Sequence, residues 1–365
     1  MALETHQAMQ GRPQSSHMSN AGVVTTGTVS FQNSQSHQPA SGEGGSERNY
    51  ETRTGTSTVV LHEFSGGSRT EGIIFVVFYL DGNTVSDWGY IQLLAADNTV
   101  LYEARVTNDN VASSTVDFSS GEGTQTLRGA SDNQIACGAW HSIAFVFKNG
   151  ATGELTGVVD GQSKTYVADG NDVGATSAVA KVKWYTMTRS GAQDMAVDSV
   201  YVFGVRTDQA SGTILPYAGG IAVPNGHDTD TNFTNESGQT SAAANLWESI
   251  DDPASAEVSE STYLQTTTND ALLLMPVDID AIWPTEDPEN IPGITIGGVH
   301  KGSSDFNAVR YACKLGGITE YGDDLDLVDG NATYKEWTFP EKPGGGAWTK
   351  ADAKNAVFGY QTRQI

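Results

Sequence analysis

The sequence predicts an all-β protein built from two β-sandwich domains with an extended N-terminal arm. Glycine is abundant, at 41 of 365 residues, only 18% of residues are charged, and Val, Thr, Ser and Tyr recur in short alternating runs. The clearest run places Ile143, Phe145 and Phe147 on one apolar strand face. The strand that follows ends in Asp160-Gly161, a pair that tolerates the positive φ of a hairpin turn.

The length of the chain suits two sandwiches, with residues to spare. We assign residues 1–55 to an arm, 56–223 to the first sandwich and 224–365 to the second, because Pro, Gly and polar residues gather around the boundary. The arm is poor in hydrophobic residues, so we do not expect it to fold alone. We expect its segment 23–31 to add as a strand to a neighbouring subunit, and a free tail is the alternative.

Strand patterns fill the first sandwich. Residues 72–80 are apolar on both faces, which predicts a central strand. Residues 90–94 and 99–106 are expected to pair across an Asp97-Asn98 turn. Further strands are predicted over 58–64, 143–147, 155–159, 179–188 and 195–203.

The second sandwich ends in a recognisable signal. Thr349 can cap a short helix, and Asp352 three residues later completes an approximate capping box. Residues 357–361 then form the last predicted strand. A Pro-rich insert at 283–292 adds a rigid acidic loop.

Two families resemble parts of this chain. The strand opened by Trp140, the hairpin closed by Asp160-Gly161 and the segment 195–203 resemble the laminin-G/concanavalin-like lectin jelly roll, over residues 55–220. Residues 240–365, with an Ala-Trp-Thr sequence just before the last strand, resemble β-sandwich domains of tailed-bacteriophage structural proteins. The resemblances imply a fold made for assembly and display, with contact to host glycans.

Charge and composition exclude several classes of partner. The 44 acidic and 20 basic residues give a net charge of −24, which repels nucleic-acid backbones. No run approaches the ~20 apolar residues of a membrane helix, and no signal peptide is visible from Met1 to Asn20. Cys137 and Cys313 are far apart in the sequence and predict buried thiols. We therefore expect no nucleic-acid and no membrane partner.

Catalytic patterns are missing from the sequence. No nucleophile elbow or phosphate loop appears, and the histidines are scattered. His141 is predicted to be a surface or packing residue. Glycoside hydrolases on lectin-like folds need two carboxylates ~5–10 Å apart, whereas Glu103 is the only strand-centred carboxylate in the first sandwich. We expect the protein not to be an enzyme.

A calcium site is a candidate at the rim of the first sandwich. Oxygen ligands on loops suit this cation, and they cluster here as Asp81, Asn83, Asp87 and Asp160. Ordinary turn chemistry explains the same residues without any metal. No other cofactor is predicted.

Aromatic residues of the first sandwich are candidates for glycan binding. Trp88, Tyr90 and Tyr102 can stack on sugar rings if they are exposed, and core packing is the alternative.

These observations predict a structural virion protein of a tailed phage, placed at the head, neck or tail surface. Its partners would be copies of itself, other virion proteins and a host surface glycan. It would assemble in the host cytoplasm and act on the virion. A secreted or cell-surface carbohydrate-binding adhesin is the alternative. An export signal upstream of Met1 would favour it. A polysaccharide depolymerase comes third and would need a cleft with two close carboxylates.

Overall fold

The computed structural model describes most of the two predicted sandwiches and short pieces of the arm. The described residues are 3–8, 24–26, 29–32, 49–52, 59–63, 68–80, 89–110, 113–136, 140–186, 195–203, 224–226, 228–230, 232–240, 263–282, 291, 293–327 and 329–365. The chain divides into two compact units, with most of the first before Gly219 and most of the second after it.

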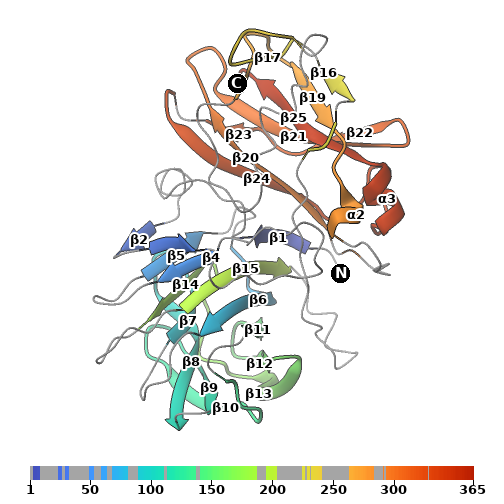
Figure 1. The fold of residues 1–365 in the computed structure, drawn as a ribbon. Coiled ribbons are helices and arrows are strands. Elements are labelled where there is room, and N and C mark those ends of the chain that lie inside the picture. Colours follow the sequence, from blue (N-terminus) through green and yellow to red (C-terminus); the bar gives the residue numbers. More distant parts are fainter. Residues whose placement is uncertain are drawn as a thin grey trace. The chain divides into compact units, whose positions relative to one another are not determined.

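Two antiparallel sheets form the first unit (Figure 1). The eight-stranded sheet has the order β13-β12-β11-β6-β15-β4-β3, with β1 also on β15; its strands are β1 (Leu3–Ala8), β3 (Val29–Gln32), β4 (Asn49–Thr52), β6 (Glu71–Leu80), β11 (Trp140–Lys148), β12 (Gly153–Val159), β13 (Gln162–Asn171) and β15 (Met195–Phe203). The seven-stranded sheet has the order β10-β9-β8-β7-β14-β5-β2; its strands are β2 (Val24–Thr26), β5 (Val59–Glu63), β7 (Gly89–Leu94), β8 (Val100–Asn110), β9 (Ser113–Ser120), β10 (Thr126–Ala130) and β14 (Lys181–Thr186).

The chain crosses between these sheets repeatedly, as in a jelly roll. The prediction of an all-β fold is confirmed, and each strand predicted in the first sandwich is present with its ends shifted by a few residues at most. Strand β6 lies between β11 and β15 in the middle of its sheet. Ile73, Ile74, Phe75 and Val76 are all at most 1% exposed, so both faces of β6 are covered, as its pattern predicted.

Aromatic side chains join the two sheets. The ring of Phe118 on β9 lies 5.5 Å from that of Phe145 on β11, and the ring of Tyr102 on β8 lies 5.3 Å from that of Phe147. Gly157 on β12 sits against Phe118, where a Cβ would come within 2.6 Å of the ring. The core therefore requires a glycine at this point of close approach.

The predicted turns are confirmed. Asn98 adopts φ 71° between β7 and β8. Asp160 and Gly161, with φ 48° and 78°, form the two-residue connection between β12 and β13. All three values lie in the left-handed region that Asn, Asp and Gly tolerate best.

Strands from residues 1–55 belong to the sheets of the same chain. β1 and β4 pair with β15, β2 pairs with β5, and β3 pairs with β4. The described parts of segment 23–31 thus pair within their own chain, and an addition of this segment to a neighbouring subunit stays a prediction. The edges of β5 and β15 offer backbone groups within the chain that these short strands satisfy.

The second unit is also made of antiparallel strands. Its six-stranded sheet has the order β16-β19-β25-β21-β22, with β23 also on β21; the strands are β16 (Thr229–Asp230), β19 (Leu272–Met275), β21 (Ala308–Leu315), β22 (Ile318–Tyr321), β23 (Leu325–Asp326) and β25 (Val357–Arg363). Two further pairs are β17 (Thr234–Asn235) with β18 (Leu264–Gln265) and β20 (Ile294–Lys301) with β24 (Ala332–Phe339).

The core of this unit lies between the six-stranded sheet and the β20–β24 pair. The hydroxyl of Tyr311 on β21 donates to the carbonyl oxygen of Lys335 on β24 at 2.6 Å and lies 2.9 Å from Nε2 of His300 on β20. Cys313 is fully buried; desolvation and the charge of Glu320 raise its pKa to about 12. The prediction of a buried thiol is confirmed for Cys313, while Cys137 lies outside the described residues.

Two short helices complete the described part of this unit. They are α2 (Ile279–Ile282) and α3 (Lys350–Asn355). The predicted capping box on α3 is confirmed, because Thr349 and Asp352 each accept from the backbone N–H of the other. Within the described residues, no helix is long and apolar enough to cross a bilayer. Most of the insert 283–292 lies outside the described residues.

Candidate functional site

The candidate site lies at one end of the first sandwich. Strand β11 separates β6 from β12, and its register places Tyr79 opposite Trp140 and Val159 opposite Ile143. The end of β6 at Leu80 and the Asp160-Gly161 turn therefore lie at the same end of the sheet. Asp81, Asn83, Asp87 and Trp88 themselves lie outside the described residues, so their predicted roles stay predictions.

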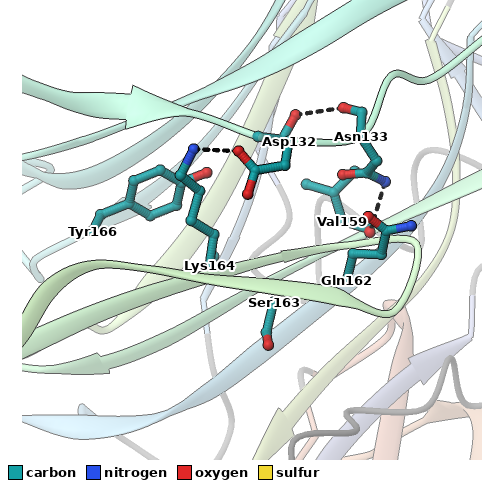
Figure 2. Close-up of a pocket in the computed structure, with 9 residues that line it drawn as sticks. Asp132, Asn133, Val159, Gln162, Ser163, Lys164 and Tyr166 are labelled. Atoms are coloured by element: carbon teal, nitrogen blue, oxygen red, sulfur yellow. Dashed lines mark hydrogen bonds and ion pairs between the residues drawn. The ribbon is translucent and has the colours of Figure 1, made fainter.

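A small polar hollow opens here between the segment after β10 and the β12–β13 hairpin (Figure 2). We call it the rim hollow. Its volume is about 30 Å³, close to the space of a single water molecule. The lining residues are Ser131, Asp132, Asn133, Gly157, Val159, Gln162, Ser163, Lys164 and Tyr166.

Hydrogen bonds fix the walls of the rim hollow. Lys164 Nζ donates to Asp132 Oδ1 at 2.5 Å and to the carbonyl oxygen of Ala130 at 2.9 Å. Asn133 Nδ2 donates to the carbonyl oxygen of Val159 at 2.9 Å. Figure 2 shows the Lys164–Asp132 and Asn133–Val159 bonds, each of which joins the loop to the hairpin. The polar side chains are therefore held in place before any ligand arrives, which lowers the ordering cost of binding.

Tyr166 supplies an aromatic wall. Its ring stacks on Phe118 with centroids 4.9 Å apart and planes at 25°. Desolvation raises the pKa of Tyr166, and the charges of Asp132 and Asp117 raise it further. The hydroxyl therefore stays protonated at neutral pH and remains available as a donor.

Asp160 has a clear role next to this hollow. Its Oδ2 lies 2.8 Å from His141 Nδ1, and its Oδ1 accepts from the backbone N–H of Ser142 at 2.8 Å. His141 is 8% exposed, so it is a buried polar residue that pairs with a carboxylate. The Asp160 carboxylate thus stabilises the hairpin, and its predicted role as a calcium ligand stays a prediction. No group of three or more His, Cys, Asp or Glu residues that could hold a metal occurs among the described residues.

The candidate glycan-stacking aromatics do not lie together. Tyr102 is fully buried between the sheets, and its hydroxyl donates to Asn149 Oδ1 at 2.6 Å. This corrects its assignment to a glycan-binding surface, because a core ring cannot reach a ligand. Tyr90 points to the opposite face of the same sheet, is 8% exposed and has the Arg105 guanidinium 5.5 Å from its ring centre.

Glu103 has neighbours on the outer face of the seven-stranded sheet. Gln92 Nε2 donates to Glu103 Oε2 at 2.5 Å, and Lys183 lies beyond Gln92 in the next strand. Desolvation lowers the pKa of Lys183, and the charge of Glu103 opposes that effect. The side chain that bonds Glu103 is the amide of Gln92 rather than the second carboxylate that a hydrolase needs. At the rim hollow, Asp132 is the single carboxylate among the lining residues.

Sequence reasoning missed the residues that form the rim hollow. Lys164 and Asp132 are 32 positions apart, and Asn133 is 26 positions from Val159. The one available signal was the Asp160-Gly161 turn, which places Gln162 and Ser163 at the start of the returning strand.

Comparisons with known proteins complete the description. No family model and no curated protein matches the chain. Among solved structures, an endo-β-1,4-glucuronan lyase from the fungus Trichoderma reesei is 16% identical, with 56% of this chain and 96% of that chain covered and a TM-score of 0.40. A carbohydrate esterase of the Shiga toxin-encoding bacteriophage phi24B is 16% identical, with 54% and 98% covered and a TM-score of 0.34.

The seed lectin of Lotus tetragonolobus is 9% identical, with 55% of this chain and 97% of that chain covered and a TM-score of 0.37. Scores of this size decide neither fold nor function.

Proposed function

We propose that this protein binds glycans at the rim hollow of its first unit. The observation that carries the proposal is the convergence of a carboxylate (Asp132), two amides (Asn133 and Gln162) and an aromatic ring (Tyr166) around one small concave site. Sugars present paired hydroxyl groups and an apolar ring face, and these side chains offer the matching acceptors, donors and surface.

The size of the hollow limits what enters it. A volume of about 30 Å³ accepts one hydroxyl group and excludes a whole sugar ring. We infer that one hydroxyl of the sugar replaces a water there, while the ring lies outside over Gln162, Ser163 and Tyr166. Gln162 and Ser163 are exposed, so they are accessible to such a ligand.

A glycan array followed by calorimetric titration with the best glycan tests this proposal. Asp132→Ala removes a charged acceptor, and we expect a loss of affinity of roughly tenfold or more. Asp169→Ala is the matched control, because Asp169 pairs with Lys148 at 3.1 Å as Asp132 pairs with Lys164. Failure of the full-length protein to bind any glycan, or equal affinities for both variants, would contradict the proposal.

We further propose display on the surface of a tailed-phage virion. The supporting observation is the end of the second unit, where Trp348, the Thr349 capping box, α3 and the last strand β25 follow in the order typical of the resembled phage domains. Electron microscopy of particles labelled with an antibody to this chain tests the proposal. Label at a bacterial cell surface and none on particles would favour the adhesin instead.

Binding without catalysis is the third part of the proposal. Its support is the single carboxylate at the rim hollow. Purified protein incubated for hours with the bound polysaccharide should leave the chain length unchanged on size-exclusion chromatography. Depolymerisation that disappears when one carboxylate is mutated would support the depolymerase hypothesis instead.

A further inference from the structure

Two arginines occupy the same outer face of the six-stranded sheet in the second unit. The register pairs Arg310 on β21 with Gln361 on β25, and Arg363 on β25 with Ala308 on β21, so the two side chains point to the same side. Arg363 bonds the carboxylates of both Asp270 and Asp324. Arg310 has no carboxylate partner among the described residues. In a chain with a net charge of −24, carboxylates far outnumber basic groups, so an arginine without a carboxylate partner stands out as a candidate binding residue.

The Arg310 guanidinium is nevertheless held firmly. Its Nε donates to Gln361 Oε1 at 2.7 Å. Gln361 is only 7% exposed and is itself fixed by donating from Nε2 to the carbonyl oxygen of Asp270 at 3.0 Å. On the other side, the Arg310 Cζ lies 4.3 Å from the ring centre of Tyr321 on β22. Groups from the two strands that flank β21 therefore orient one half-buried cation.

This arrangement leaves a specific part of Arg310 available. The Nε position is occupied by Gln361, whereas the two terminal nitrogens bond no acceptor among the described residues. Two parallel N–H groups at the end of a guanidinium fit the two oxygens of a carboxylate. Tyr321 is 40% exposed, so a ligand can reach this residue beside the guanidinium.

We propose that Arg310, positioned by Gln361 and Tyr321, binds the carboxylate of an acidic sugar such as a uronic acid. The exposed part of Tyr321 supplies an aromatic surface beside the guanidinium for the sugar ring. This second site lies in the second unit and does not depend on the rim hollow. If Arg310 only held the edge strand β22 in place, its contact with the Tyr321 ring would be enough. The hydrogen bond from Arg310 to the buried Gln361, which orients the guanidinium, would then have no purpose.

Calorimetric titration of the full-length protein at low salt tests the site with three probes: an oligomer of glucuronic acid, a neutral glucose oligomer of the same length and inorganic phosphate. We expect binding of the acidic oligomer only. Arg310→Gln should weaken it by about tenfold or more, and Arg310→Lys by less, because lysine keeps the charge and loses the fork. Tyr321→Phe keeps the ring and should bind as the unmodified protein does.

Lys301→Gln is the matched control, since it removes one exposed positive charge from the same unit and should leave the affinity unchanged. Asp132→Ala should also leave it unchanged, which separates this site from the rim hollow. Circular dichroism melts check that each variant is folded. No binding of the acidic oligomer, equal affinity in folded Arg310→Gln, equal weakening by Lys301→Gln, or phosphate binding that the acidic oligomer does not displace would each overturn the proposal.

Discussion

The Nδ1 atom of His141 lies 2.8 Å from Oδ2 of Asp160 in the folded first unit. The other ring nitrogen, Nε2, lies 2.7 Å from the carbonyl oxygen of Ala136. A carboxylate and a carbonyl both accept, so the ring satisfies both only by donating from both nitrogens, as an imidazolium. His141 therefore connects the loop before β11 to the β12–β13 turn as a buried cation.

The first prediction is a raised pKa for His141. Burial alone lowers this pKa, but the bonds to Asp160 and Ala136 and the charge of Asp160 outweigh burial and raise the pKa above 6.5. The stabilisation is then complete below about 6.5 and is lost as pH rises through the folded-state pKa. An NMR titration of the imidazole signals should show this value, and Asp160→Asn should lower it. A His141 pKa below 6.5 in the unmodified protein would contradict the imidazolium.

The second prediction concerns acid stability. Glu122 accepts from the hydroxyls of Ser177 and Thr176 and from the backbone N–H of Thr176, and these bonds lower its pKa to about 2. Its contribution is present above the ordinary value of 4.5 and is lost as pH falls from there to about 2. Glu122→Gln should flatten the decrease in melting temperature over this range. An unchanged slope would show that the carboxylate does not stabilise the fold.

The third prediction tests the close approach of the two sheets. Gly157→Ala places a Cβ within 2.6 Å of the Phe118 ring. We expect a loss of about 1–3 kcal/mol in the free energy of unfolding, typical of overpacking. In a Phe118→Leu background the same substitution should cost less, which a double-mutant cycle measures. Equal costs in both backgrounds would mean that the ring is not the obstacle.

The fourth prediction concerns the capping box of the second unit. Thr349→Ala removes the acceptor for the Asp352 N–H, and we expect a loss of about 1 kcal/mol of stability. Thr349→Ser keeps the hydroxyl and should stay close to the unmodified protein. Denaturant unfolding of both variants measures the difference, and similar losses in both would point to packing of the threonine methyl instead.

The fifth prediction keeps the calcium hypothesis open for Asp81, Asn83 and Asp87. If calcium binds the folded state, millimolar calcium should raise the melting temperature of the protein by mass action. Asp81→Ala should abolish the shift without unfolding the calcium-free protein. A melting temperature that responds to neither calcium nor chelator would exclude a site in the folded state.

Local features were predictable because their causes are local. A continuous apolar run predicted that both faces of β6 are covered, and the tolerance of Asp160-Gly161 for positive φ predicted a hairpin turn. A threonine three residues before an aspartate predicted the cap of α3. Each depends on residues that are neighbours in the chain, so the sequence alone carried the information.

The strand order decided everything that joins distant residues. The alternating pattern does not tell which face of the sheet Tyr90 or Tyr102 occupies. Tyr102 is buried because β8 packs against the other sheet. Asp132 meets Lys164, and Arg310 meets both Gln361 and Tyr321, because particular strands lie side by side. Alternation tells which residues share a face of one strand, whereas hydrogen bonding between strands distant in sequence determines which faces and edges meet.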